Sequence, residues 1–203
     1  MVVIIDYGVG NLFSLVSSFK SIGVEAIVSG DKSVIQKADK LILPGVGAFG
    51  DASNKLFSSG LADVIIDLAN KGVPLMGICL GMQMLFDKSF EYGEYKGLGL
   101  IKGEVRPIKE VIKSDLKIPH IGWNALSFTK EKSEIFKYLN DGDYVYFVHS
   151  FYGANCSESI IATTEYGAIL TAAVAHKNVY GCQFHPEKSG NVGLKILKAF
   201  CEL

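Results

Sequence analysis

A single cysteine, Cys79, stands where an apolar strand pattern changes into a helical pattern. It lies in VPLMGICLGMQMLF, residues 73–86, with Gly77 and Gly81 two positions before and after it. Glycines at these positions let backbones pass closely at a sharp strand-to-helix turn, which presents the central side chain as a nucleophile. Free N–H groups at the start of the helix favour the thiolate, the reactive form of cysteine. A buried cysteine in an ordinary strand-to-helix turn explains the pentapeptide equally well.

A thiolate nucleophile needs a proton carrier, and His185 is the histidine best placed for that role. It follows the strand pattern VYGCQF and opens the tripeptide HPE. Pro186 ends the strand, and Glu187 is close enough in sequence to hold the second ring nitrogen, as the third member of a catalytic triad does. These residues predict a triad of Cys79, His185 and Glu187. The alternative is a surface turn with an incidental histidine and glutamate.

The other three histidines are expected in structural positions. His120 and His176 are predicted to lie in loops or turns. His149, in YFVHSF, ends an apolar strand pattern and is expected to be a core or rim residue whose hydrogen bonds are satisfied.

The elements that must position these residues alternate between strand and helix in the first part of the chain. Strand patterns cover residues 2–6, 24–29, 40–44 and 73–78, and helical patterns cover 12–22 and 56–68 and follow Cys79. This alternation predicts an α/β fold with a doubly wound, mainly parallel sheet and helices on both faces. After about Gly97, short apolar runs predict added antiparallel strands in the C-terminal half. We expect a single domain over residues 1–203.

The composition limits the kinds of function. Hydrophobic residues make up 49% of the 203 residues, charged residues make up 20%, and the formal net charge is −1. No basic block favours nucleic acid or an anionic membrane as a partner. No apolar run approaches the roughly 20 residues of a membrane span, and the N-terminus has no basic signal-peptide region. We therefore expect a cytoplasmic protein.

The cysteines give no sign of a metal site. Cys79, Cys156, Cys182 and Cys201 form no C-x-x-C pair, so neither zinc nor a dithiol redox motif is predicted. We expect free thiols in a reducing compartment and no cofactor.

Several motifs together resemble a known family. GICLGMQ and QFHPEKSG resemble the class I (triad) glutamine amidotransferases, and the similarity extends from DYGVGNL through LPGVGAFGD to the C-terminal half. Within that family, PGVGAFGDA and IPHIGWN resemble the glutaminase subunits of imidazole glycerol phosphate synthases. One departure is Phe151, where relatives often carry tyrosine, and a backbone contact there survives the change.

The resemblance implies an activity and a set of site residues. Cys79 attacks the side-chain amide of glutamine, His185 protonates the departing ammonia and then activates water, and Glu187 orients His185. The implied oxyanion donors are the N–H groups of Leu80 and of Val46 or Gly47. The implied substrate contacts are Gln83, one helical turn after Cys79, Glu91 for the ammonium group, and the backbone of Ser150 and Phe151.

The resemblance also implies a partner. Ammonia passes to a (β/α)8-barrel cyclase subunit, which makes imidazole glycerol phosphate and an aminoimidazole carboxamide ribonucleotide in histidine biosynthesis. Lys188 and Asn11 match interface residues of the family. An ordinary solvated lysine explains Lys188 equally well, since most surface charges contribute little.

Three alternatives stay open at this point. GVGAFG, residues 45–50, is a G-x-G-x-x-G after a strand, and Asp31 lies about 20 residues past Gly10, as in dinucleotide-binding modules. Against that reading, Phe13 occupies the third glycine position of the first glycine stretch, and Pro44 precedes the second. A non-catalytic interaction protein of the same fold is a second alternative. The third is a glutaminase subunit of another synthase, such as that for pyridoxal phosphate or anthranilate.

Overall fold

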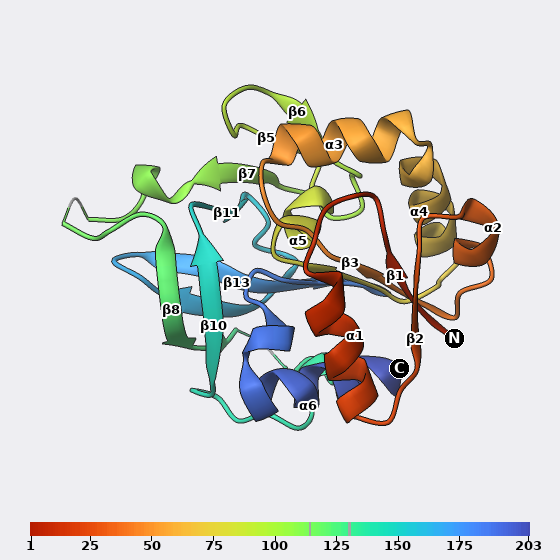
Figure 1. Ribbon diagram of the computed structural model, residues 1–203. Coiled ribbons are helices and arrows are strands. Elements are labelled where there is room, and N and C mark those ends of the chain that lie inside the picture. The colour runs from red at the N-terminus through yellow and green to blue at the C-terminus, as the bar shows by residue number, and fades with distance from the viewer. Residues whose placement is uncertain (114, 130) are drawn as a thin grey trace.

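The computed structural model describes residues 1–113, 115–129 and 131–203 and is built around one eight-stranded sheet with the strand order β2-β1-β3-β4-β14-β13-β12-β9. The first five strands pair in parallel, and β13, β12 and β9 pair antiparallel (Figure 1). These strands are β1 Val2–Ile5, β2 Ala26–Ser29, β3 Lys40–Leu43, β4 Leu75–Ile78, β9 Ser127–Phe128, β12 Ile160–Glu165, β13 Ile169–His176 and β14 Val179–Cys182. The predicted fold class, a mainly parallel sheet with added antiparallel strands, is confirmed.

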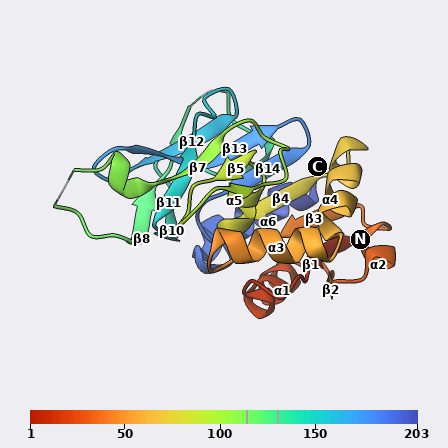
Figure 2. The same ribbon diagram turned by 90° about the horizontal axis from the view of Figure 1, so that it is seen from above.

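Helices cover both faces of the sheet. On one face lie α1 (Leu12–Ser21) and α6 (Gly190–Cys201), and on the other lie α3 (Phe49–Ser58), α4 (Leu61–Asn70) and α5 (Leu80–Met84) (Figure 1). Seen from above, α3, α4 and α5 lie over the parallel half of the sheet, and the later strands gather at its other end (Figure 2). The short helix α2 (Lys32–Ile35) joins β2 to β3.

Strand β1 shows why the strands read as continuous apolar runs. Its side chains alternate between two cores: Val3 and Ile5 belong to the core under α3 and α4, and Val2 and Ile4 belong to the core under α1 and α6. All four are buried. A parallel strand covered on both faces has no solvent side, so it needs no polar alternation.

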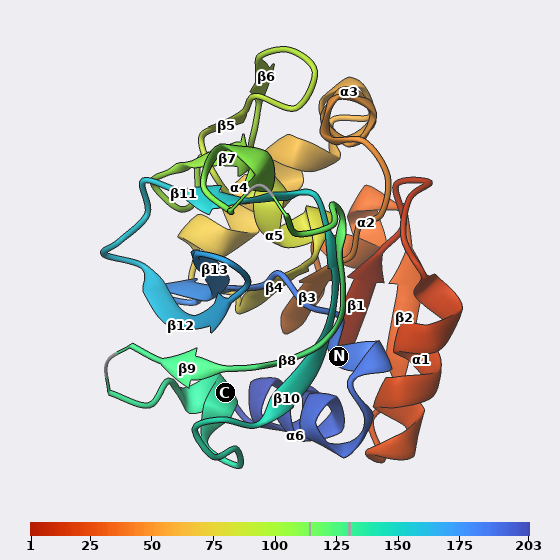
Figure 3. The same cartoon turned by 90° about the vertical axis from the view of Figure 1, so that its left-hand side faces the viewer.

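Two smaller sheets flank the main one. Strands β8 (His120–Ala125) and β10 (Tyr144–His149) form an antiparallel ribbon that runs past α6 (Figure 3). The other small sheet has the order β11-β7-β5-β6, with β5 Lys88–Ser89, β6 Tyr95–Lys96, β7 Glu104–Pro107 and β11 Phe151–Ala154. The 3-10 turns are η1 Ile108–Glu110, η2 Glu134–Phe136 and η3 Pro186–Lys188.

One predicted helix is wrong in its extent. The apolar residues from Leu56 to Leu68 predict a single helix, but α3 ends at Ser58 and α4 begins at Leu61. Gly60 between them takes the left-handed conformation, with φ of 69°. Both helices pack on the same core, so the apolar positions continue across the break and hide it. The short elements α2, β5 and β6 are absent from the prediction, and the single domain stays a prediction.

Candidate active site

Cys79 sits between β4 and α5 in a strained conformation, with φ of 54° and ψ of −111°. A Cβ on Gly77 would lie 2.5 Å from the carbonyl oxygen of Gly81, and a Cβ on Gly81 would lie 1.8 Å from that of Leu43. Both distances are too short for any side chain. The predicted reason for the two glycines, close passage of backbones at a sharp turn, is confirmed.

His185 and Glu187 form a buried pair on the turn that follows β14. Nδ1 of His185 lies 2.8 Å from Oε1 of Glu187, and both side chains are 2% exposed. Burial lowers the pKa of His185, but its interactions with Cys79 and with Glu187 outweigh burial and raise the pKa to about 9. Nε2 of the ring has no hydrogen-bond partner among the described residues. The carboxylate therefore fixes the ring and leaves Nε2 available for proton transfer.

A cavity of about 380 Å³ opens beside this pair. Ten of the predicted site residues line it: Val46, Gly47, Cys79, Leu80, Gln83, Glu91, Ser150, Phe151, His185 and Lys188. Glu187 lies behind His185. Asn11 does not line the cavity; it caps α1, and its side chain accepts a hydrogen bond from the N–H of Ser14.

Two glycine-rich segments meet at one wall of the cavity. A Cβ on Gly45 would lie 2.8 Å from the backbone nitrogen of Gly81, so the PGVG segment packs directly on the first turn of α5. Gly47 follows with φ of 97°, a conformation that other residues rarely adopt. Backbone N–H groups from PGVG and from Leu80 are thus carried on adjoining segments.

Glu91 is a buried carboxylate on the cavity wall. Its Oε2 accepts a hydrogen bond of 2.6 Å from the N–H of Phe49, the first residue of α3. Burial raises the pKa of Glu91, and the bond from Phe49 opposes that rise. Among the residues that the structure describes, no salt bridge involves Glu91, and a buried carboxylate of this kind suits a positively charged ligand group.

The site also contains two residues that the sequence interpretation did not assign to it, His149 and Gln183. His149 lines the cavity. Gln183 is fully buried directly after β14, with Nε2 3.8 Å from Sγ of Cys79. The signal for Gln183 was a polar residue inside the apolar run VYGCQF, which needs a buried partner.

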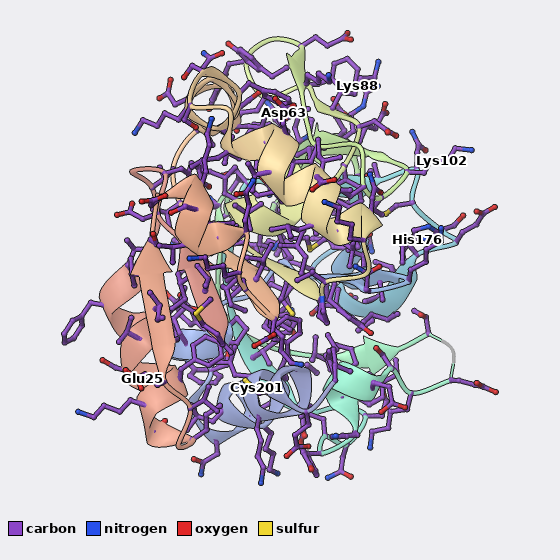
Figure 4. All side chains as sticks on the ribbon, turned by 90° about the vertical axis from the view of Figure 1, so that its right-hand side faces the viewer. Glu25, Asp63, Lys88, Lys102, His176 and Cys201 are labelled. Atoms are coloured by element: carbon purple, nitrogen blue, oxygen red, sulfur yellow. The ribbon has the colours of Figure 1, made fainter. Side chains whose placement is uncertain are left out.

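The predicted loop position of His120 is wrong. It begins strand β8, is 2% exposed, and stacks on the rings of Phe147 and Tyr166 with centroid distances of 5.0 Å and 4.0 Å. Its Nδ1 lies 3.0 Å from Nε2 of His149. His176 ends β13 next to a turn, close to its predicted place (Figure 4).

A family model described as glutamine amidotransferase class-I matches residues 3–202. The chain belongs to the class-I glutamine amidotransferases. The family predicted from the motifs is confirmed, and the dinucleotide-binding alternative is set aside, since the amidotransferase model covers residues 3–202 and so includes both glycine stretches.

Two relatives that match over nearly their whole length carry the name of one particular synthase subunit. This amidotransferase is 52% identical over 202 residues, 99% of this chain and 98% of the relative, to "Imidazole glycerol phosphate synthase subunit HisH" of Lactococcus lactis subsp. lactis (strain IL1403). It is 46% identical, with full coverage of both chains, to the protein of the same name from Wolinella succinogenes.

Solved structures agree on the fold of the amidotransferase. A structure titled "Crystal structure of glutamine amidotransferase" aligns with a TM-score of 0.77 at 20% identity, covering 100% of this chain and 98% of that one. "Structure of PurLQS from Thermotoga maritima" aligns with a TM-score of 0.75 at 19% identity, covering 99% and 97%.

Within the described residues of the amidotransferase, no group of three or more His, Cys, Asp or Glu side chains is arranged to hold a metal ion. Across residues 1–113, 115–129 and 131–203, no helix has the length and apolar character needed to cross a membrane.

Proposed function

We propose that this chain is the glutaminase subunit of an imidazole glycerol phosphate synthase, which hydrolyses glutamine to glutamate and ammonia. The observation that carries the proposal is the cavity wall shared by Cys79, on its glycine-flanked turn, and His185, held by buried Glu187. The full-length similarity to synthase subunits supports this assignment over the pyridoxal phosphate and anthranilate alternatives.

The first half of the reaction releases ammonia. The Cys79 thiolate attacks the carbonyl carbon of the glutamine side chain, and the carbonyl oxygen takes the negative charge. His185, whose pKa of about 9 keeps it protonated at neutral pH, gives its Nε2 proton to the departing amine. The C–N bond breaks, and a thioester on Cys79 and neutral His185 remain.

The second half regenerates the enzyme. Neutral His185 takes a proton from water, and the resulting hydroxide attacks the thioester carbon. The C–S bond breaks, so that glutamate leaves, the Cys79 thiolate returns, and His185 is again protonated. The Glu187 carboxylate holds the ring through the 2.8 Å bond to Nδ1.

Backbone N–H groups complete the chemistry. The Leu80 N–H, and that of Val46 or Gly47, stabilise the oxyanion in both halves, since these segments adjoin at the cavity wall. One such donor contributes roughly 10²–10³ in rate.

Glutamine is held by its α-groups at the cavity wall. Buried Glu91 binds the ammonium group, and the backbone of Ser150 and Phe151 contacts the α-carboxylate. Gln83 contacts the substrate through its Oε1. Its Nε2 is already bonded to the Phe151 carbonyl at 3.2 Å and to Oε1 of Gln183 at 3.0 Å.

The partner is a (β/α)8-barrel cyclase that receives the ammonia, and it docks over the cavity mouth. Exposed Lys188 lines that mouth. On strand β8, Ile121 and Trp123 are 58% and 54% exposed. Apolar side chains of that size on one face of a strand mark an interaction surface. Free thiols at all four cysteines suit work in the cytoplasm.

A glutaminase assay tests the proposal. The chain is mixed with the cognate cyclase and its ribonucleotide ligand, and glutamate and imidazole glycerol phosphate are measured. We expect glutamine to be hydrolysed and its nitrogen to appear in the imidazole ring. Glutamine hydrolysis without transfer of nitrogen to the cyclase product would retain the glutaminase and reject the synthase assignment.

A further inference from the structure

A chain of buried hydrogen bonds ends on the sulfur of Cys79, and the mechanism above does not use it. Gln183 is 0% exposed, and its Nε2 lies 3.8 Å from Sγ of Cys79. Its Oε1 accepts a hydrogen bond of 3.0 Å from Nε2 of Gln83. Gln83 in turn donates to the carbonyl of Phe151 at 3.2 Å. The path therefore runs from the glutamine-binding wall to the nucleophile.

The carbonyl of Phe151, at one end of this series of hydrogen bonds, fixes the direction of every bond in it. A backbone carbonyl can only accept, so Gln83 must present its amide nitrogen to Phe151. The same nitrogen faces Gln183, which must then present its oxygen. Only the nitrogen of Gln183 is left to point at the sulfur, since its amide has just these two ends.

We propose that Gln183 is a hydrogen-bond donor to the Cys79 sulfur and that Gln83 positions it by fixing the direction of its amide. The sulfur also lies 3.9 Å from the carbonyl of Val148. The thiol can donate to that carbonyl while it accepts from Gln183, whereas the thiolate keeps only the bond from Gln183. The residue that carries this sulfur has a strained backbone, with φ of 54°. The proposal rests on Cys79 being the nucleophile of the proposed function.

The chemical benefit is greatest for the thiolate. A hydrogen bond to a charged group in a buried site is stronger than one to a neutral group. The N–H of Gln183 therefore favours the thiolate before attack and again when the thioester breaks. Loss of a bond of this kind lowers the rate by about 10- to 100-fold.

The test measures the reactivity of the sulfur without glutamine. Iodoacetamide is small and neutral and does not need the α-group contacts. The alkylation rate of Cys79 is measured by mass spectrometry of the peptides and divided by that of Cys201 in the same molecule. Cys201 is partly exposed on α6 and does not line the cavity, so it serves as the internal control (Figure 4).

Gln183→Met keeps the side-chain length and removes the donor. We expect the Cys79/Cys201 alkylation ratio to fall by about 10- to 100-fold, with a similar fall in kcat for glutamine hydrolysis and a smaller change in KM. A purely structural role would lower the melting temperature and leave the ratio at the parental value, and that result would overturn the proposal.

Gln83→Glu tests the relay itself, because residue 83 does not touch the sulfur. A carboxylate accepts and does not donate, so Gln183 must turn its nitrogen toward residue 83 and its oxygen toward the sulfur. We expect the alkylation ratio to fall nearly as far as in Gln183→Met, and the double variant to show no further fall. Gln36→Glu is the matched control, since Gln36 is exposed at the end of α2.

The outcomes separate the two claims. If Gln83→Glu alkylates like Gln36→Glu and the parent, the relay is wrong. If Cys79→Ala still hydrolyses glutamine in the complex, the proposed function fails irrespective of Gln183. If Cys79→Ala is inactive and Gln183→Met keeps the parental kcat and alkylation ratio, only the inference about Gln183 fails.

Discussion

Nδ1 of His120 lies 3.0 Å from Nε2 of His149, and Nδ1 of His149 lies 2.8 Å from the carbonyl of Phe151. The carbonyl can only accept, so His149 carries its proton on Nδ1 and accepts at Nε2. His120 must then donate from its own Nδ1. Both rings are neutral, because burial lowers the pKa of His120 to about 4 and that of His149 to about 3.

This pair predicts a loss of stability in mild acid. Histidines in the unfolded chain take up protons below pH of about 6.5, whereas the buried pair, which faces Tyr166 and His185, stays neutral until about pH 4. The unfolded state binds more protons in this window, so stability falls by about 1.4 kcal/mol per pH unit for each proton. Urea unfolding of the parent and of His120→Asn between pH 7.5 and 4.5 measures this pH-dependent loss of stability. Parallel pH dependences in the two proteins would contradict the assignment of the neutral pair.

Cys79→Ala is expected to abolish glutamine hydrolysis, because no other described thiol lines the cavity. Cys156→Ala, Cys182→Ala and Cys201→Ala should retain most of the activity. Mass spectrometry after treatment with an electrophilic glutamine analogue should place the label on Cys79. A label on another cysteine would refute the assignment of the nucleophile.

His185→Ala is expected to lose roughly 10²–10⁴ in kcat, the usual contribution of a general acid–base. Glu187→Gln should lose less, because an orienting group acts through the imidazole. Burial opposes protonation of His185, and Glu187 helps to overcome it. Without that carboxylate the pKa falls, so the alkaline limb of the pH–rate profile should move to lower pH. An unmoved alkaline limb in Glu187→Gln would argue against this role.

Gly81→Ala is expected to destabilise the fold by about 3 kcal/mol or more, as severe overpacking does. The added Cβ would lie 1.8 Å from the carbonyl of Leu43, so β3 and α5 would have to separate. Gly142→Ala is the control. Gly142 has φ of 89°, but among the described residues an added Cβ would meet no heavy atom within 4 Å apart from its chain neighbours, so this variant should cost only about 1–2 kcal/mol. If urea unfolding gave equal losses of stability for the two variants, steric overlap at the turn would not be the cause of the destabilisation.

The isolated chain is expected to hydrolyse glutamine very slowly, since an uncoupled glutaminase would release ammonia to solvent. Gly45 and Gly47 allow the peptide at Val46 to take two orientations, only one of which completes the oxyanion site. Docking of the cyclase should select that orientation and raise kcat by roughly 10²–10³.

Variants at the rim test whether docking drives this activation. Lys188→Ala should fold normally, whereas Asn11→Ala also removes the N-cap of α1 and should lower stability by about 1 kcal/mol. Both variants should show weaker stimulation by the cyclase and its ligand, with ammonia lost to solvent. Equal rates for the free parent chain and the liganded complex would exclude the switch.

The sequence by itself determined the features that depend on neighbours along the chain. Cys79 with its glycines, and His185 with Pro186 and Glu187, are short motifs whose local geometry follows from backbone sterics and from side-chain reach. The alternation of apolar strands with helices determined the mainly parallel sheet, because each pattern can bury its face in only one type of element. The break at Gly60 was hidden, since α3 and α4 share one core.

Only the tertiary structure decided how distant segments complete the site. Gln183 meets Cys79 because β14 pairs with β4, and Gly181 stands opposite Gly77 in that register. His120 is buried against His149 because β8 pairs with β10 in a register that sets them opposite each other. Neither contact leaves a periodic trace in the sequence. Buried polar groups must find hydrogen-bond partners, but which partners they find depends on the register of strands far apart in the chain.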